Sequence, residues 1–190
     1  LHHSAWADGR NLFSDGGALS KTGLSYLAGM QRRLGETAII GAPMPNSYRR
    51  RVAYTYAPTT ASWGVDNRSV ALRVIEGDDD AVRIEAREAG ADANPFLLAA
   101  VQIAAGLEGV VEGLPPADPP VEGDAYAAKG RAPIPCTMLE ALEAARDSSF
   151  LRGVLGEHLT GLLITQGEQE LALVEAQVTP VETERYLEAM

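Results

Sequence analysis

Seven arginines within residues 49–87, with one carboxylate between the last two of them, are the part of this sequence best suited to chemistry. A guanidinium group binds carboxylate or phosphate oxygens through paired hydrogen bonds, and a carboxylate among such groups can hold a divalent metal ion. The pattern therefore predicts a site for a small anionic substrate and a metal–nucleotide. The segments that carry it are NSYRR (46–50), WGVDNRSVALR (63–73) and RIEAR (83–87), and the residues are Arg49, Arg50, Arg51, Arg68, Arg73, Arg83, Arg87 and Glu85.

Strands are expected to present the second half of this set. Residues 68–76 and 81–87 alternate between apolar and polar side chains, which is typical of two neighbouring strands. Because side chains in a strand repeat every two residues, Arg83, Glu85 and Arg87 share one face. A face with this composition must either meet water or line a polar site.

Helices and loops are expected around these strands. Ser20, Asn94 and Thr179 each precede a helical pattern and suit the N-cap position, and Pro95 suits the first helical turn. The expected helices cover 20–34, 94–112, 138–147, 151–155, 156–175 and a last segment from 179, and the expected irregular segments are 1–17, 43–50 and 113–135.

The composition excludes several classes of partner. The chain is acidic, with 26 Asp and Glu against 16 Lys and Arg and a formal net charge of −10, so no nucleic-acid partner is expected. No apolar run reaches the ~18 residues of a membrane span, because Gln102, Gly106 and Glu108 interrupt 95–111, so no membrane partner is expected. Cys136 is the only cysteine, which rules out an intrachain disulfide and favours a reducing, cytoplasmic location.

Taken in order, the motifs resemble the C-terminal catalytic portion of the glutamine synthetase family. The resemblance rests on His-x-Ser near the start, NLF, YLAG, NSYRR, WGVDNRS-x-ALR, RIEAR and ANPF, and it runs from Leu1 to Met190. That family joins L-glutamate to ammonia or another amine at the expense of ATP, through a γ-glutamyl phosphate. The resemblance therefore implies an ATP-dependent ligase that uses Mg²⁺ or Mn²⁺. It also implies an α+β fold in which helices pack outside a curved, mostly antiparallel sheet.

The resemblance also implies a role for each matched side chain. Taken singly, each of them has an alternative as a solvated or ion-paired surface residue, and only the ordered set of motifs favours function. The implied roles are Arg50 and Arg87 as contacts of substrate glutamate, Arg68 as the catalytic residue at the transferring phosphoryl group, Arg73, His2 and Ser4 as ATP or phosphate contacts, and Glu85 as a metal ligand.

The segment after NSYRR departs from the pattern of ammonia-using members, which carry a glutamate in a flap there. Here RVAYTYAPTT (51–60) has Tyr56 at that place and no acidic residue. The form YAPTTASWGVDNRS is closer to members that glutamylate polyamines or alkylamines, so an amine larger than ammonia is expected. The alternatives are an ordinary ammonia-using glutamine synthetase and a catalytically silent structural relative.

Residues 1–190 are expected to form only the C-terminal part of the catalytic domain. The N-terminal domain and the Glu-x-Glu region of the family, which supply further metal ligands, have no counterpart in this sequence, and the first histidine of the His-x-His-x-Ser motif would fall just before Leu1. Ligase turnover by these 190 residues alone is therefore not expected. Family members form rings with active sites between subunits, so the expected partners are glutamate, ATP, an amine and further copies of the chain.

Overall fold

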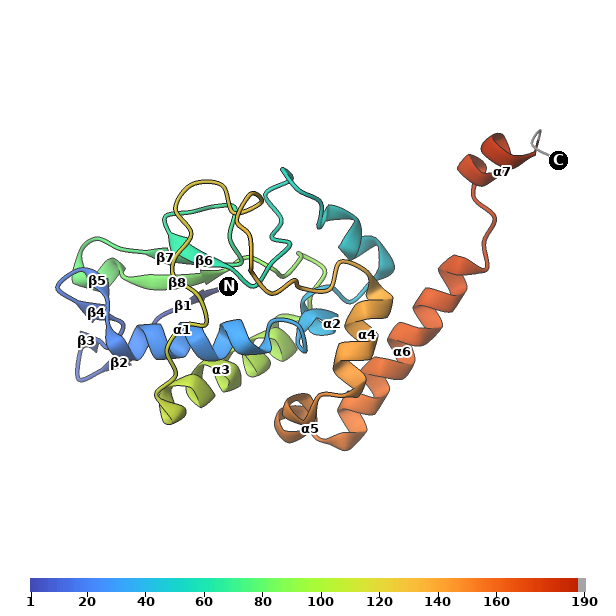
Figure 1. Ribbon diagram of the computed structural model, residues 1–190. Helices are drawn as coiled ribbons and strands as arrows, with labels where there is room; N and C mark the ends of the chain where they lie inside the picture. The colour runs from blue at the N-terminus through green and yellow to red at the C-terminus, as the bar shows by residue number, and fades with distance from the viewer. Residues whose placement is uncertain (188–190) are drawn as a thin grey trace.

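A mixed four-stranded sheet lies at the centre of the fold in the computed structural model, which describes residues 1–187 (Figure 1). Its strand order is β1 (His2–His3), β8 (Arg83–Ala86), β7 (Leu72–Ile75) and β6 (Trp63–Val65). β1 pairs with β8 and β8 with β7 in antiparallel fashion, whereas β7 and β6 are parallel. With the helices around it, this sheet confirms the α+β fold class.

The two faces of β7 and β8 differ as the alternation predicts. One face is fully buried in the main core, and the other carries the charged side chains, which are half-buried. The buried face consists of Leu72, Val74, Ile84 and Ala86, and the polar face of Arg73, Arg83 and Glu85 together with Ile75. The period of two therefore aims the charged set away from the core.

The strands are shorter than the sequence predicts. The expected strand 68–76 is reduced to β7 because 68–71 forms a turn. The Asn67 carboxamide oxygen accepts hydrogen bonds from the backbone nitrogen of Ser69 at 2.9 Å and from its hydroxyl at 2.7 Å, which fixes that turn. Arg68 consequently lies on a turn, and not on a strand.

The first 20 residues form two tight hairpins, where the sequence predicts only loops. β2 (Trp6–Ala7) pairs with β3 (Arg10–Asn11), and β4 (Ser14–Asp15) pairs with β5 (Ala18–Leu19). The Asp8-Gly9 turn has φ angles of 49° and 73°, which match the mirror-image turns that suit two-residue hairpins.

Helix α1 (Lys21–Arg33) packs on the buried face of the sheet, and helix α3 (Pro95–Glu112) packs against α1 on the side away from the sheet (Figure 1). The predicted N-caps are confirmed: Ser20 accepts a hydrogen bond from the nitrogen of Gly23, and Asn94 accepts from those of Phe96 and Leu97. By length and composition α3 could cross a bilayer, contrary to the sequence-based expectation. One side of α3 packs closely on α1 and forms ion pairs with it, and 33% of the helix is buried.

Three further helices form a second packed unit with α2 (Ala38–Gly41). These are α4 (Met138–Arg146), α5 (Ser149–Leu155) and the first part of α6 (Glu157–Glu175), whereas α7 (Pro180–Tyr186) lies outside this unit. α6 and α7 lead away from the sheet, and most side chains from residue 172 to 187 are exposed (Figure 1). Thr179 caps α7 as predicted, through a capping box with Glu182.

The NSYRR motif lies on a 3₁₀ helix, Pro45–Arg50, where the sequence predicts an irregular loop. Proline at its first position suits a helical start, and the Ser47 hydroxyl accepts a hydrogen bond from the backbone nitrogen of Met44 at 3.1 Å. The helix is followed by an irregular segment, 51–60, that runs back to β6. Residues 113–135 are irregular apart from an isolated bridge between Thr60 and Pro133, as predicted.

Candidate active site

A row of polar side chains crosses the sheet from β1 to β7. In the strand register His2 lies opposite Glu85, and Glu85 lies opposite Arg73. Opposite residues on neighbouring strands have Cβ atoms about 5 Å apart, so these three side chains share one patch of the polar face. The structure therefore brings together the expected nucleotide contacts His2 and Arg73 and the expected metal ligand Glu85.

Glu85 is held between two arginines. Its carboxylate accepts a hydrogen bond from Arg73 at 3.1 Å and another from Arg87 at 3.0 Å. Burial alone would raise the pKa of Glu85, but the hydrogen bond from Arg73 and the charge of Arg87 outweigh it and hold the pKa below its usual value. The carboxylate is therefore an anion at neutral pH and remains available to a cation.

Arg73 has a second partner that the sequence analysis missed. Its guanidinium group donates to Asp66 at 2.9 Å as well as to Glu85. Asp66 has a φ of 48°, an uncommon value for a residue other than glycine. The Asp-Asn pair that follows the apolar run of β6 was the available signal, because such pairs favour turns at strand ends.

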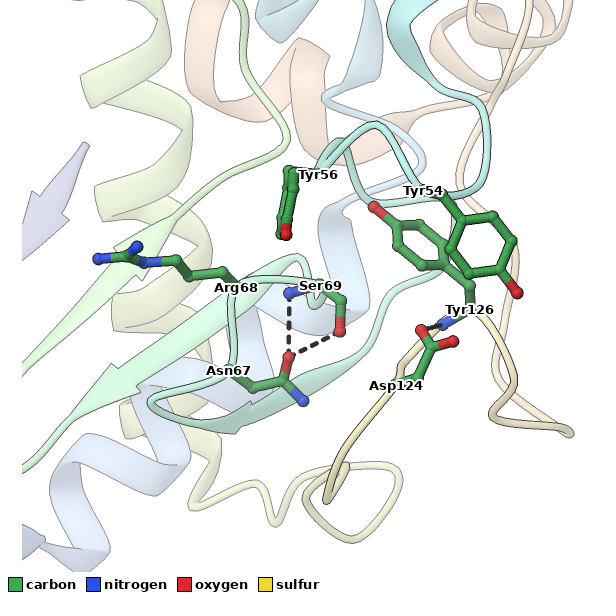
Figure 2. A pocket seen from close by; sticks show the side chains of 7 residues that line it. All are labelled: Tyr54, Tyr56, Asn67, Arg68, Ser69, Asp124 and Tyr126. Carbon is green, nitrogen blue, oxygen red and sulfur yellow. Dashed lines mark hydrogen bonds between the residues drawn. The ribbon is translucent and has the colours of Figure 1, made fainter.

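Arg68 lines a pocket of about 310 Å³ beside this row (Figure 2). Three tyrosines and one acid surround the pocket, and its walls come from three separate segments. Figure 2 shows the Arg68 side chain extending away from the Tyr54–Tyr126 pair, with Tyr56 between them. The lining residues are Tyr54, Tyr56, Asn67, Arg68, Ser69, Asp124 and Tyr126.

The two expected glutamate contacts meet at one turn after β8. Arg87 donates a hydrogen bond to the carbonyl oxygen of Tyr56 at 3.4 Å. Arg50 donates to the carbonyl oxygen of Glu88, the residue that follows Arg87 in the chain. Arg51 also donates to that carbonyl, at 3.3 Å, and is buried. Arg50 and Arg87 thus lie near each other, whereas Arg51 is a buried side chain with a structural role.

The other residues that the sequence singles out have fewer contacts with this site. Ser4 is exposed and accepts a hydrogen bond from the Trp6 indole at 3.0 Å. Arg83 donates to Nδ1 of His2 at 3.3 Å, which links it to the edge of the polar row. Arg49 is exposed and lines a separate hollow beside Cys136, so it does not belong to the site.

A chain of buried, hydrogen-bonded side chains, called the buried relay below, lies on the core side of the sheet, and the sequence analysis missed it. The Tyr26 hydroxyl donates to Nδ1 of His3 at 3.1 Å, and Nε2 of His3 donates to the Gln102 carboxamide at 2.9 Å. Gln102 in turn donates to the Glu88 carboxyl at 2.5 Å. Burial lowers the pKa of His3 and raises that of Glu88, so it favours the neutral form of each side chain.

The signal for this relay was present in the alternation of β8. Glu88 follows Ile84 and Ala86 at intervals of two residues, which places its side chain on the same buried face. A carboxyl group there requires a partner or a proton, and it has Gln102. The relay connects β1, α1 and α3 to the turn whose carbonyl binds Arg50.

A complete metal cage is absent from residues 1–187, since no three His, Cys, Asp or Glu side chains come together there. Mg²⁺ is nevertheless commonly bound by one or two carboxylates together with substrate phosphates and water. Glu85, ionised and flanked by Arg73 and Arg87, fits one position in such a shell. The described residues therefore fit a partial metal site.

The chain was compared with known proteins. Residues 1–186 match the family model "Glutamine synthetase, catalytic domain". The chain is 38% identical over 184 residues to gamma-glutamylethanolamide synthetase GlnA4 of Streptomyces coelicolor, covering 97% of this chain and 39% of that protein. It is 38% identical over 177 residues to gamma-glutamylputrescine synthetase PuuA of Escherichia coli, covering 93% and 37%. It is 33% identical over 196 residues to a glutamine synthetase of Thermus thermophilus, covering 98% and 44%.

Solved structures give the same result. The GmaS/ADP complex in conformation 1 superposes with a TM-score of 0.87 at 28% identity, over 98% of this chain and 45% of that one. The chain belongs to the glutamine synthetase family, and its fold is that of the family's catalytic domain. It spans 37–44% of the length of the three relatives named above.

Proposed function

We propose that this chain is the C-terminal part of the catalytic domain of an ATP-dependent ligase that joins the γ-carboxylate of L-glutamate to an amine. The observation that carries the proposal is Glu85, ionised between Arg73 and Arg87 and opposite His2 in the sheet. Such a row suits a polyphosphate and its metal ion better than a neutral ligand. Family membership and ligase relatives support the same activity.

Each side chain in the row has a role in this reaction. Arg73 binds ATP phosphate oxygens, and Arg68 neutralises charge that builds up on the transferring phosphoryl group. Phosphoryl transfer is catalysed mainly by positioning and charge neutralisation, which suits fixed guanidinium groups. His2 and Ser4 contact the nucleotide at the edge of the sheet.

Glutamate lies on the other side of Glu85 in this proposal. Arg50 and Arg87 bind its carboxylate, since both meet at the turn after β8 and planar guanidinium groups match carboxylates. Glu85 supplies one ligand to Mg²⁺ or Mn²⁺. When bound, that ion neutralises negative charge on the phosphates and orients them.

The amine is larger than ammonia in this proposal. The segment 51–60 contains no acidic side chain that could receive ammonium, and Tyr56 lines the pocket there. Relatives named for ethanolamide, putrescine and isopropylamine products or substrates, each 38% identical to the chain, support this. The alternative is an ammonia-using glutamine synthetase, which glutamine synthetase relatives at 30–38% identity support, a type-1 glutamine synthetase at 38% among them.

A larger assembly completes the site. Further metal ligands come from carboxylates outside residues 1–187, because these residues hold no metal cage of their own. We also propose a homo-oligomeric ring with active sites between subunits. Exposed apolar side chains along the end of α6 and on α7 support a surface of this kind, namely Leu173, Val178, Val181 and Tyr186.

The test uses the full-length enzyme and the variant Glu85→Gln, which keeps the shape of the side chain and removes its charge. The wild type is expected to release phosphate from ATP only with glutamate and an amine. The variant should lose about 100-fold or more in kcat and require more Mg²⁺, as is usual when electrostatic stabilisation is removed. The matched control Glu76→Gln, at the end of β7, should retain activity. Wild-type activity in Glu85→Gln would overturn the assigned role.

A further inference from the structure

We infer that the tyrosine pocket, lined by Tyr54, Tyr56, Tyr126, Asp124 and Arg68, binds the amine, and that this amine carries a second cationic group. The inference rests on the proposed ligase function and names the substrate class of that site. Asp124 receives the distal cation, and the reacting nitrogen points toward Arg68. A linear diamine has this chemistry.

The pocket has the walls of a binding site. Its two aromatic sides come from segments far apart in the sequence that are tied together: the Tyr126 hydroxyl donates to the carbonyl oxygen of Ala57 at 3.1 Å. The rings of Tyr54 and Tyr126 lie 5.3 Å apart between centroids and are tilted by 53°. The volume of about 310 Å³ falls at the lower end of small-molecule sites, which suits a short ligand.

Two tyrosines are held where a ligand can reach them. Tyr54 and Tyr56 are 74% and 69% exposed, so most of each side chain stays accessible, although Tyr54 also packs against Tyr126. Both also have positive φ angles, 70° and 58°, in the region that bulky residues rarely adopt. Strained residues with exposed aromatic faces on one short segment indicate selection for contact with a ligand.

The charges in the pocket favour a cation at one end. Asp124 accepts one hydrogen bond, from the backbone nitrogen of Tyr126 at 2.9 Å, and forms no ion pair with any residue in 1–187. Its negative charge therefore stays available. Tyrosine faces add attraction for a nearby cation through the ring quadrupole. Figure 2 shows Asp124 close to Tyr54 and Tyr126, with Arg68 at the opposite end.

The polarity of the pocket orients the amine. Arg68 repels a protonated nitrogen and, in the proposed function, lies beside the transferred phosphoryl group, so the end near it must be the uncharged nucleophile. This nitrogen attacks the γ-carbonyl carbon of γ-glutamyl phosphate, and a C–N bond forms. The bond from carbon to the phosphate oxygen breaks, and the phosphate leaves with its electron pair and takes the nitrogen's proton. The second ammonium group stays at Asp124 and is not consumed.

The test is a comparison of two amines with the same four-carbon chain in the full-length enzyme: 1,4-diaminobutane and n-butylamine. The wild type is expected to favour the diamine in kcat/KM by tenfold or more. Asp124→Asn should reduce that ratio at least tenfold, mainly through the KM for the diamine. Glu122→Gln, which removes one charge from the same loop outside the pocket, should leave the ratio unchanged.

The possible outcomes separate this inference from the proposed function. If no amine, ammonium included, supports glutamate-dependent ATP cleavage, the proposed function fails. If ammonium or n-butylamine is used with a kcat/KM equal to that of the diamine, the proposed ligase function stands and the inference of a second cation is overturned. An unchanged ratio in Asp124→Asn would also overturn it. Tyr54→Phe serves as a second variant: it keeps the ring, so the diamine preference should persist.

Discussion

Glu88 illustrates how a single buried carboxyl group can organise a charged site without belonging to it. Its side chain receives a hydrogen bond from Gln102, and its backbone carbonyl binds both Arg50 and Arg51. The second carboxyl oxygen is buried and has no hydrogen-bond partner among residues 1–187. A neutral carboxylic acid fits this environment, since an isolated charge there would be strongly unfavourable.

Replacing Glu88 by glutamine should therefore be tolerated, whereas Glu88→Ala should not. Glutamine keeps the shape and an oxygen for Gln102, while alanine leaves the relay without its acceptor and should reduce the free energy of unfolding by about 1–3 kcal/mol. The measurement is urea denaturation of the full-length protein at neutral pH. Equal destabilisation by both variants would contradict a neutral Glu88.

The same residue sets a pH dependence with a definite sign. Burial raises the pKa of Glu88 above its ordinary 4.5, so the stabilising proton is fully bound below pH 4.5. This contribution is lost as the pH rises through the raised folded-state pKa. Glu88→Gln, which cannot titrate, should therefore gain stability relative to the wild type as the pH increases above 4.5.

Among the elements, α1 and α3 approach each other most closely at a pair of glycines. A Cβ atom on Gly29 would overlap the carbonyl oxygen of Ala105 and would lie 2.7 Å from the nitrogen and 2.9 Å from the Cα of Gly109. These are backbone atoms that can move only if the whole helix moves. The contact therefore requires glycine at position 29.

Gly29→Ala should accordingly destabilise the protein by about 1–3 kcal/mol or more, as expected when a tightly packed contact is overfilled. Gly161→Ala is the matched control: this glycine lies inside α6, and a Cβ atom there would meet nothing within 4 Å. The control should gain roughly 0.5–1 kcal/mol from helix propensity. Thermal unfolding of both variants measures the difference, and a stabilised Gly29→Ala would refute the close packing.

An ion-pair cluster joins the same two helices about one turn further along α1. Glu108 on α3 accepts two hydrogen bonds from Arg33 on α1, at 2.6 and 2.8 Å, and pairs with Arg32 at 2.9 Å. The hydrogen bond from Arg33 is the main cause that lowers the pKa of Glu108 from 4.5 to about 2. A group with a lowered folded-state pKa stabilises the fold above its ordinary pKa.

Acid should therefore weaken the α1–α3 contact in a defined window. The stabilisation is present above pH 4.5 and is lost as the pH falls from there toward about 2. Unfolding free energies measured across this range should fall less steeply in Glu108→Gln than in the wild type. Parallel curves for the two proteins would show that the pair contributes nothing.

The elements could be predicted to different degrees from the sequence. Helix starts were predicted because Ser20, Asn94 and Thr179 carry caps that act locally, and all three are confirmed. The strand faces followed from a period of two. The strand ends and hairpins were not predicted, since side-chain hydrogen bonds such as that of Asn67 decide them and leave no periodic pattern.

The candidate site divides in the same way. Glu85 and Arg73 could be placed together because adjacent strands with matching alternation must align their charged faces. Asp124 and Tyr126 could not be placed beside Arg68, because an irregular loop of more than twenty residues carries them. Only the folded path of 113–135 determines which side chains reach the pocket.

At the scale of the whole molecule, the chain spans 37–44% of three ligase relatives, and no metal cage forms within residues 1–187. The isolated 190-residue chain should therefore show no glutamate-dependent ATP cleavage, while the full-length protein should. A phosphate-release assay on both at equal concentration measures this. Substantial turnover by the isolated chain would contradict the proposal that other carboxylates complete the site.

The strand β1 connects the polar row to the buried relay. His2 lies opposite Glu85 in the polar row, whereas the neighbouring His3 bonds Tyr26 and Gln102 in the core. Because adjacent strand residues point to opposite faces, these two residues link both sides of the sheet. A ligand that touches His2 would therefore stabilise the strand that also holds the relay, and would slow amide exchange as far away as Gln102 and Tyr26.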